Sequence, residues 1–147
     1  MIAAMRGAVY EALKREEKSF DMYVRLRQEA KDQVLKDFFF MLAEDTKKDM
    51  HTLKHLNLHS IIKFGLAIKF STPQFEIDDK ILKGITDKPG ALDIIKLCID
   101  EVNADIEYYE HISNNTLFPE VKRLFRIISD KELEHKAKLL ALRDLLE

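Results

Sequence analysis

A Glu-x-x-His pattern near the C-terminal end of the sequence places Glu132 and His135 three residues apart. In a helix, residues at this spacing lie on one face, so a carboxylate oxygen and an imidazole nitrogen can bind the same ion. Such a mixed ligand pair suits iron, manganese or zinc. Three further acidic residues interrupt apolar patterns elsewhere in the chain: Glu16, Asp49 and Asp105.

The helical pitch indicates that these polar residues face inward. At about 100° per residue, Glu16 lies about 40° from Phe20, and Glu132 lies about 40° from Ile128. His135 falls on the same apolar stripe as Glu132. An unpaired ionised carboxylate in a protein interior costs several kcal/mol, and clustered carboxylates raise one another's pKa. A bound cation removes this cost because it accepts the carboxylates as ligands.

Two alternatives to a central metal site stay open. Glu132 and His135 could be satisfied by Asp49 or Asp105 without any metal, and His135 with Asp49 would make a good buried hydrogen-bonded pair across the bundle. A second histidine pattern, His51, His55 and His59, recurs at steps of four, and adjacent members could chelate a metal on one helix face. These three side chains point away from the bundle axis, so we expect a surface or dimer-facing ladder.

Helices must position these residues. Apolar residues recur at helical spacing in four segments, which predicts helices over about 7–30, 33–56, 91–113 and 119–146. Asp32 is a suitable N-cap for the second helix, and Pro119 is tolerated in the first turn of the fourth. Short connections within each pair predict two antiparallel hairpins. Residues 57–90 contain helix breakers, so we expect a long crossover with fragments of helix.

The two hairpins form an internal repeat. A shift of 86 residues superposes them without a gap and pairs, for example, Tyr23 with Tyr109. Two similar hairpins joined by a long crossover predict an all-α four-helix bundle. The polar interruptions fall at one level of the repeat, so carboxylates and an imidazole from up to four helices should converge in mid-bundle. The matched positions are Glu16 with Val102, Thr46 with Glu132, and Asp49 with His135.

Composition excludes several other classes of protein. The 147 residues fit a single domain, 1–147, and 4 Gly and 3 Pro are too few for a turn-rich β-sandwich or barrel. The 24 basic and 26 acidic residues balance, so we expect no nucleic-acid partner, and no apolar stretch predicts a membrane helix or a signal peptide. The single cysteine, Cys98, excludes a disulfide framework and suits a small core residue in a cytoplasmic protein.

Both hairpins resemble a known family. The first predicted helix, with Glu16 seven residues before Tyr23, resembles the first helix of rubrerythrins and other ferritin-like carboxylate proteins. The segments 39–45 and 124–135 resemble their second and fourth helices. The resemblance implies a ferritin-like four-helix bundle that forms a homodimer. It also implies a diiron site with one Glu on the first and third helices and Glu-x-x-His on the second and fourth.

Carried over by position, the resemblance gives an incomplete ligand set. Glu16 matches the first-helix Glu, and Glu132 and His135 match the fourth-helix pair. Asp49 replaces the second-helix His, and Asp105 stands where rubrerythrins can carry an additional carboxylate.

At two positions the sequence departs from the family's ligand pattern and lacks a carboxylate. Thr46 stands where a bridging Glu is expected, and Val102 replaces the third-helix Glu. Two irons about 3.5–4 Å apart need bridging ligands. We therefore expect a degenerate site that holds a single iron, manganese or zinc ion, with these candidate ligands: Glu16, Asp49, Asp105, Glu132 and His135.

The resemblance implies peroxide reduction or reaction with oxygen by a non-haem iron oxidoreductase. The rubredoxin-like module of full rubrerythrins needs four cysteines, which this sequence lacks. A redox cycle would therefore need an external electron donor. The alternative is a non-catalytic ferritin-like module, structural or for interaction, that has lost the diiron site.

Overall fold

Four long helices make up most of the described part of the chain. The computed structural model describes residues 2–59 and 90–147. The helices span Ile2–Glu29 (α1), Gln33–Lys54 (α2), Ala91–Asn115 (α5) and Pro119–Leu146 (α6). Most of the segment expected as a crossover, 57–90, lies outside the described residues. Among the helices of the two described ranges, none has the length and apolar character needed to cross a membrane.

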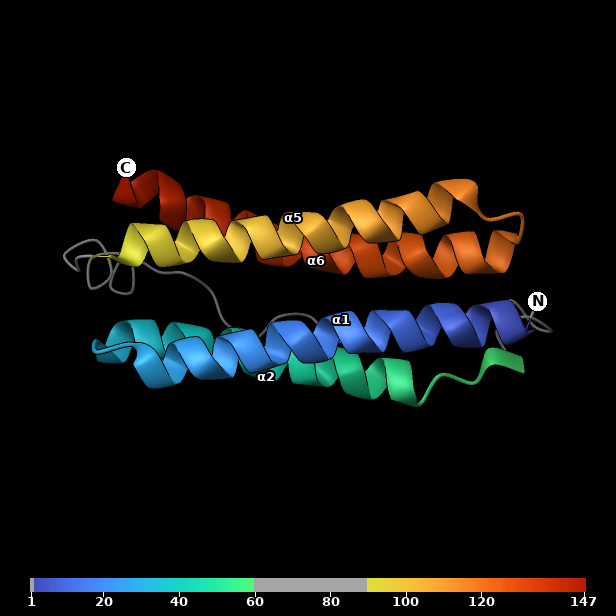
Figure 1. Ribbon diagram of the computed structural model, residues 1–147, viewed down its shortest axis with the longest axis horizontal. Coiled ribbons are helices and arrows are strands. Elements are labelled where there is room, and N and C mark those ends of the chain that lie inside the picture. Colours follow the sequence, from blue (N-terminus) through green and yellow to red (C-terminus); the bar gives the residue numbers. More distant parts are fainter. Residues whose placement is uncertain (1, 60–89) are drawn as a thin grey trace.

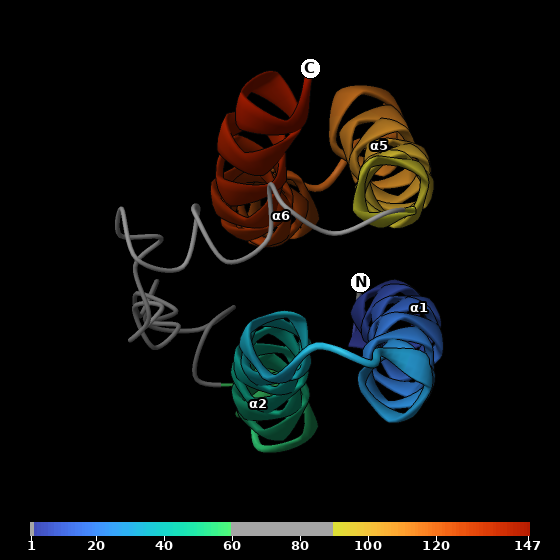
Figure 2. The same cartoon turned by 90° about the vertical axis from the view of Figure 1, so that its left-hand side faces the viewer.

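The helices form two hairpins, as predicted. α1 packs against α2, and α5 packs against α6. Asp32 caps α2 by accepting a hydrogen bond from the backbone N–H of Leu35 at 3.2 Å, and Pro119 begins α6. The hairpins stack so that α5 faces α1 and α6 faces α2 (Figures 1 and 2). The predicted all-α architecture of two helical hairpins is therefore confirmed.

The helix bounds differ from the predicted ones by two or more residues at three ends. α1 begins at Ile2, well before residue 7, because Met5 continues its buried stripe. α2 ends at Lys54, two residues early, and His55 follows as its C-cap. α5 continues to Asn115, whose side-chain amide donates to the backbone carbonyl of His111 at 2.7 Å.

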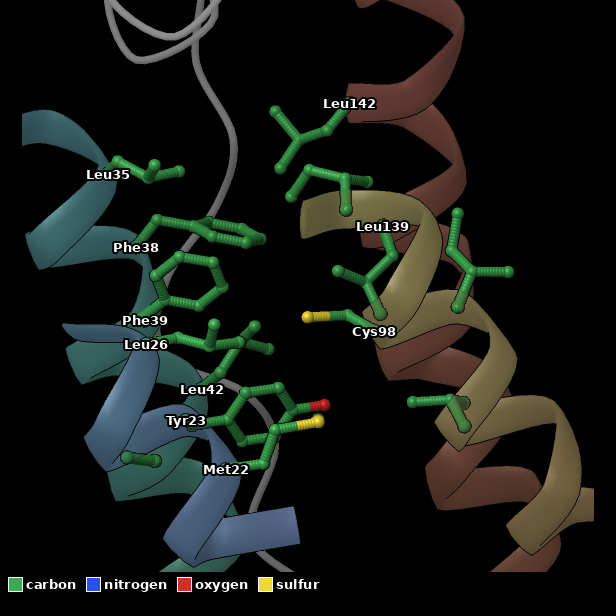
Figure 3. Packing of buried hydrophobic residues seen from close by; sticks show 14 of the residues in the cluster. Met22, Tyr23, Leu26, Leu35, Phe38, Phe39, Leu42, Cys98, Leu139 and Leu142 are labelled. Atoms are coloured by element: carbon green, nitrogen blue, oxygen red, sulfur yellow. The ribbon is translucent and has the colours of Figure 1, made fainter. Parts of the chain in front are cut away.

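The apolar core consists of two clusters on either side of a polar layer. One cluster includes Tyr23, Phe39 and Leu139, and Figure 3 shows its α2 side chains facing those of α6. The other includes Val9 and Phe125 near the opposite end of the helices. Between them, each helix contributes buried polar residues to mid-bundle. The layer is held between two apolar clusters, so most of its groups find their partners within it or at its edges.

An approximate twofold axis crosses the bundle and relates the two hairpins of the internal repeat. α1 runs antiparallel to the facing α5, and α2 runs antiparallel to the facing α6 (Figure 1). Residues that correspond in the repeat therefore meet where the axis passes. Three such pairs lie together: Ser19 with Asp105, Asp45 with Lys131, and Asp49 with His135.

Candidate metal centre

A buried group of three ligand-type side chains joins α2 to α6. Asp45 and Asp49 stand one turn apart on α2, and His135 faces them from α6. One ligand atom of each lies within 4.8 Å of the other two. The Nε2 atom of His135 is hydrogen-bonded to Oδ2 of Asp45, and all three residues are at most 4% exposed. We call Asp45, Asp49 and His135 the central cluster.

A buried lysine already places a positive charge at this cluster. The Lys131 side chain is 6% exposed, and its Nζ lies 3.4 Å from Oδ1 and Oδ2 of Asp45. The same ammonium lies 3.8 Å from Oδ1 of Asp49 and 3.6 Å from Oε2 of Glu134, whose side chain is 53% exposed. The central cluster is therefore neutralised in part by the protein itself.

The two aspartates differ in charge because their contacts differ. Burial raises the pKa of Asp49 to about 9, and the nearby Lys131 offsets only part of this effect. Neither oxygen of Asp49 has a hydrogen-bond partner. Burial also raises the pKa of Asp45, but His135 and Lys131 outweigh burial and hold that pKa below its usual value. At neutral pH, Asp45 is therefore ionised while Asp49 holds a proton.

A second acidic pair lies beside the central cluster. Burial raises the pKa of Glu16, and the neighbouring carboxyl of Glu132 offsets part of the rise. Burial and the charge of Glu16 raise the pKa of Glu132 well above its usual value. The phenol of Tyr109 donates a hydrogen bond to Oε1 of Glu16 at 3.2 Å. This pair therefore holds at least one proton in the interior at neutral pH.

The structure does not bring Asp105 to the central cluster. The Asp105 carboxylate lies between α1 and α5, where it accepts hydrogen bonds from Arg15 at 3.0 Å and from the Ser19 hydroxyl at 3.3 Å. The Arg15 guanidinium in turn lies over the Tyr108 ring, 3.7 Å from its centroid. Asp105 is therefore engaged by protein groups on the other face of the polar layer.

We expect Asp105→Asn to change the free energy of unfolding by less than about 1 kcal/mol, because the loss of the charge-assisted hydrogen bond to Arg15 is offset by relief of the buried charge, whose burial raises the pKa of Asp105. Metal uptake should not change. Urea unfolding and metal counting test both expectations, with Glu101→Gln, which alters the Lys18–Glu101 ion pair near the surface, as the control. Loss of metal uptake in Asp105→Asn would mean that Asp105 is a metal ligand.

The two positions expected to lack ligands remain without ligand function in the structure. The Thr46 hydroxyl donates to the Leu42 carbonyl of its own helix at 2.8 Å. Val102 is 1% exposed and belongs to the apolar cluster around Tyr23. The Thr46 hydroxyl is therefore engaged within its own helix, and Val102 has no ligand atom.

Sequence reasoning missed Asp45 and Lys131. The expected metal-free pair joined His135 to Asp49, whereas His135 is bonded to Asp45 in the structure. Two signals in the sequence point to the correct partners. Asp45 lies about 40° from Asp49 on a helix and therefore shares its face. The 86-residue repeat also pairs Asp45 with Lys131, an acid with a base at the level of the other polar positions.

The second histidine pattern lies on the surface, as expected. His51 and His55 are exposed, and their ring centroids lie 4.2 Å apart at the end of α2. His59 is also exposed. Among the His, Cys, Asp and Glu residues of 2–59 and 90–147, the central cluster alone gathers three ligand atoms within 4.8 Å of one another.

Comparisons of the chain with protein-family models, with curated proteins and with solved structures found no match.

Proposed function

We propose that this protein binds one divalent transition-metal ion at the central cluster, through carboxylate oxygens of Asp45 and Asp49 and a ring nitrogen of His135. The observation that carries the proposal is Asp49, a carboxyl that is 2% exposed and has no hydrogen-bond partner on either oxygen. A buried polar group without a partner is costly, and a cation between Asp49 and its neighbours would supply one.

The donor set fits the ions expected from the sequence. One nitrogen and two carboxylate groups suit iron, manganese or zinc. Ligand atoms on one ion with bonds of about 2.1 Å lie at most about 4.2 Å apart. The ligand atoms of the central cluster lie within 4.8 Å of one another, so small side-chain rotations would bring them onto one ion.

We further propose iron as the ion and peroxide or oxygen as the oxidant, in keeping with the resemblance to rubrerythrins. Bound iron would supply one-electron chemistry, and an external donor would restore the electrons. The chain itself would supply protons, because burial and the charge of Glu16 raise the pKa of Glu132, which therefore keeps its acidic proton at neutral pH. A homodimer in the cytoplasm remains part of this proposal.

One observation favours a second candidate function. The Lys131 ammonium already lies against Asp45 and Asp49, so the bundle can remain folded around an internal ion pair without metal. The chain would then be a non-catalytic structural or interaction module. Unchanged melting after chelation, together with no retained metal, would favour this alternative.

Metal counting tests the proposed function directly. The protein is loaded with iron(II) under anaerobic conditions, passed over a desalting column and analysed for metal. We expect about one ion per chain in the natural protein and in His51→Ala, and almost none in His135→Ala, because a lost ligand lowers affinity steeply. About two ions per chain would contradict a single-ion site.

Turnover tests the redox part of the proposal. Iron-loaded protein should consume peroxide in the presence of a chemical reductant faster than His135→Ala treated in the same way. Equal rates in the two proteins would leave metal binding in place and remove the peroxidase-like role.

A further inference from the structure

Lys131 lies between an inner and an outer acceptor. On the inner side, its ammonium contacts both oxygens of Asp45 at 3.4 Å and approaches Asp49 at 3.8 Å. On the outer side, Oε2 of Glu134 lies 3.6 Å away, on a side chain that is half exposed. Glu134 lies three residues further along α6, on the same side of the helix. A small rotation of the lysine side chain would therefore transfer the ammonium from the central cluster to Glu134.

A metal ion would compete with this ammonium for the same oxygens. The two like charges would lie a few ångströms apart in a buried environment, where their repulsion is strong. Asp45 and Asp49, once both are ionised, carry two negative charges, which a divalent ion neutralises without the lysine. The lysine must therefore leave Asp45 when an ion binds, or else the ion binds weakly.

The internal repeat shows that a buried lysine stands at this position in only one of the two hairpins. The position that corresponds to Lys131 in the first hairpin is Asp45. A symmetric centre would have an acid in both places, whereas here α6 supplies a base opposite the acid of α2. The positive charge stands where a second carboxylate ligand would otherwise complete the centre.

We propose that Lys131 and the metal ion are alternative occupants of the central cluster. In the metal-free protein the ammonium neutralises Asp45, and when an ion binds it moves outward to Glu134. This inference rests on the proposed function and specifies its regulation: Lys131 keeps the metal-free bundle folded and lowers the affinity for metal, so that loading is reversible.

Zinc titration of Lys131→Met tests the proposal. Methionine keeps much of the length of the lysine side chain and removes its charge. All variants carry His55→Ala, which breaks both adjacent pairs of the surface histidine pattern, so that these histidines do not chelate zinc. We expect the zinc dissociation constant to fall about tenfold or more, because a close like charge has been removed. We also expect the metal-free variant to melt at a lower temperature. Lys18→Met, at a side chain that is 73% exposed, is the control and should change neither value.

Amine labelling of the protein with natural Lys131 gives a test that does not depend on folding of the variant. Lys131 should be protected from an amine-reactive reagent in the metal-free state, because its side chain is 6% exposed. Zinc should make it more reactive, while labelling of the exposed Lys18 stays constant, as read by peptide mass spectrometry. Unchanged protection with zinc bound would overturn the outward movement.

The possible failures are distinguishable. If zinc binds with the same affinity to Lys131→Met and to the natural sequence, and His135→Ala still loses it, the competition is wrong and the metal site stands. If neither protein binds zinc, the proposed function itself fails. If Lys131→Met alone binds zinc, the competition is supported and Lys131 is the permanent occupant in the natural protein.

Discussion

Asp49→Asn should remove metal binding without destabilising the metal-free protein. Asp49 holds a proton at neutral pH, since burial raises its pKa to about 9. An asparagine amide has nearly the same shape as a protonated carboxyl and needs no proton uptake on folding, so the free energy of unfolding at neutral pH should rise by about 4 kcal/mol, whereas below pH 4 it should change little. Metal binding needs the charged carboxylate, so affinity should fall at least about 100-fold.

Asp45→Asn provides the matched comparison, because it makes the same chemical change one turn away on the same helix. Asp45 is ionised and contacts His135 and Lys131. Removal of its charge leaves a buried ammonium without its closest counter-ion. We expect a loss of about 3–5 kcal/mol in the metal-free protein. Chemical denaturation of both variants, with and without metal, gives the two values.

The contrast between the two variants separates the two candidate functions. If the protein binds metal, Asp49→Asn should not destabilise the metal-free state. The variant should lack the additional stability that metal gives to the natural protein. In a purely structural module, Asp49 would be a needed partner of Lys131. A loss of several kcal/mol in metal-free Asp49→Asn, with no effect of metal on either protein, would support the module.

The two hairpins could be predicted from the sequence because apolar residues recur periodically in their helices. Apolar residues at helical spacing and short connections determine which helices pair, and the match of Tyr23 with Tyr109 shows that both halves repeat one pattern. The same register explains why Asp49 and His135 lie together in the structure. Residues that correspond in the repeat and lie near a twofold axis must approach each other, whatever their chemistry.

Side-chain partners could not be predicted in the same way. Arg15 reaches Asp105 from the neighbouring helix, and Lys131 reaches inward although lysine is usually solvated. Both depend on how a long side chain rotates and on which acid lacks a partner. Helical spacing determines the face of a helix on which a residue lies, but not which of two nearby carboxylates a cation or an imidazole will bind.

The metal-free protein should become less stable as the pH rises from about 4 to about 9. Asp49 has a pKa near 3.9 in an unfolded chain and about 9 in the folded protein, so the folded state binds one more proton across this range. Stability from this proton is complete below pH 4 and is lost as the pH rises toward 9, at about 1.4 kcal/mol per pH unit. Glu132, whose pKa is also raised, adds to the slope, whereas the lowered pKa of Asp45 acts only in acid.

Zinc should oppose this trend, because Asp49 must release its proton to bind an ion. Affinity should therefore rise about tenfold per pH unit up to about pH 9, and the stabilisation by zinc should grow as the metal-free protein weakens. Urea unfolding at pH 5, 6.5 and 8, with and without zinc, measures both slopes. Asp49→Asn should reduce the slope of the metal-free protein, and Asp144→Asn, at a side chain that is 65% exposed, should leave it unchanged. A metal-free protein whose stability is constant or rises between pH 5 and pH 8 would mean that Asp49 is ionised in the folded state. Its unpartnered oxygens would then have to be neutralised by Lys131 alone, and the main reason for placing a metal ion beside them would disappear.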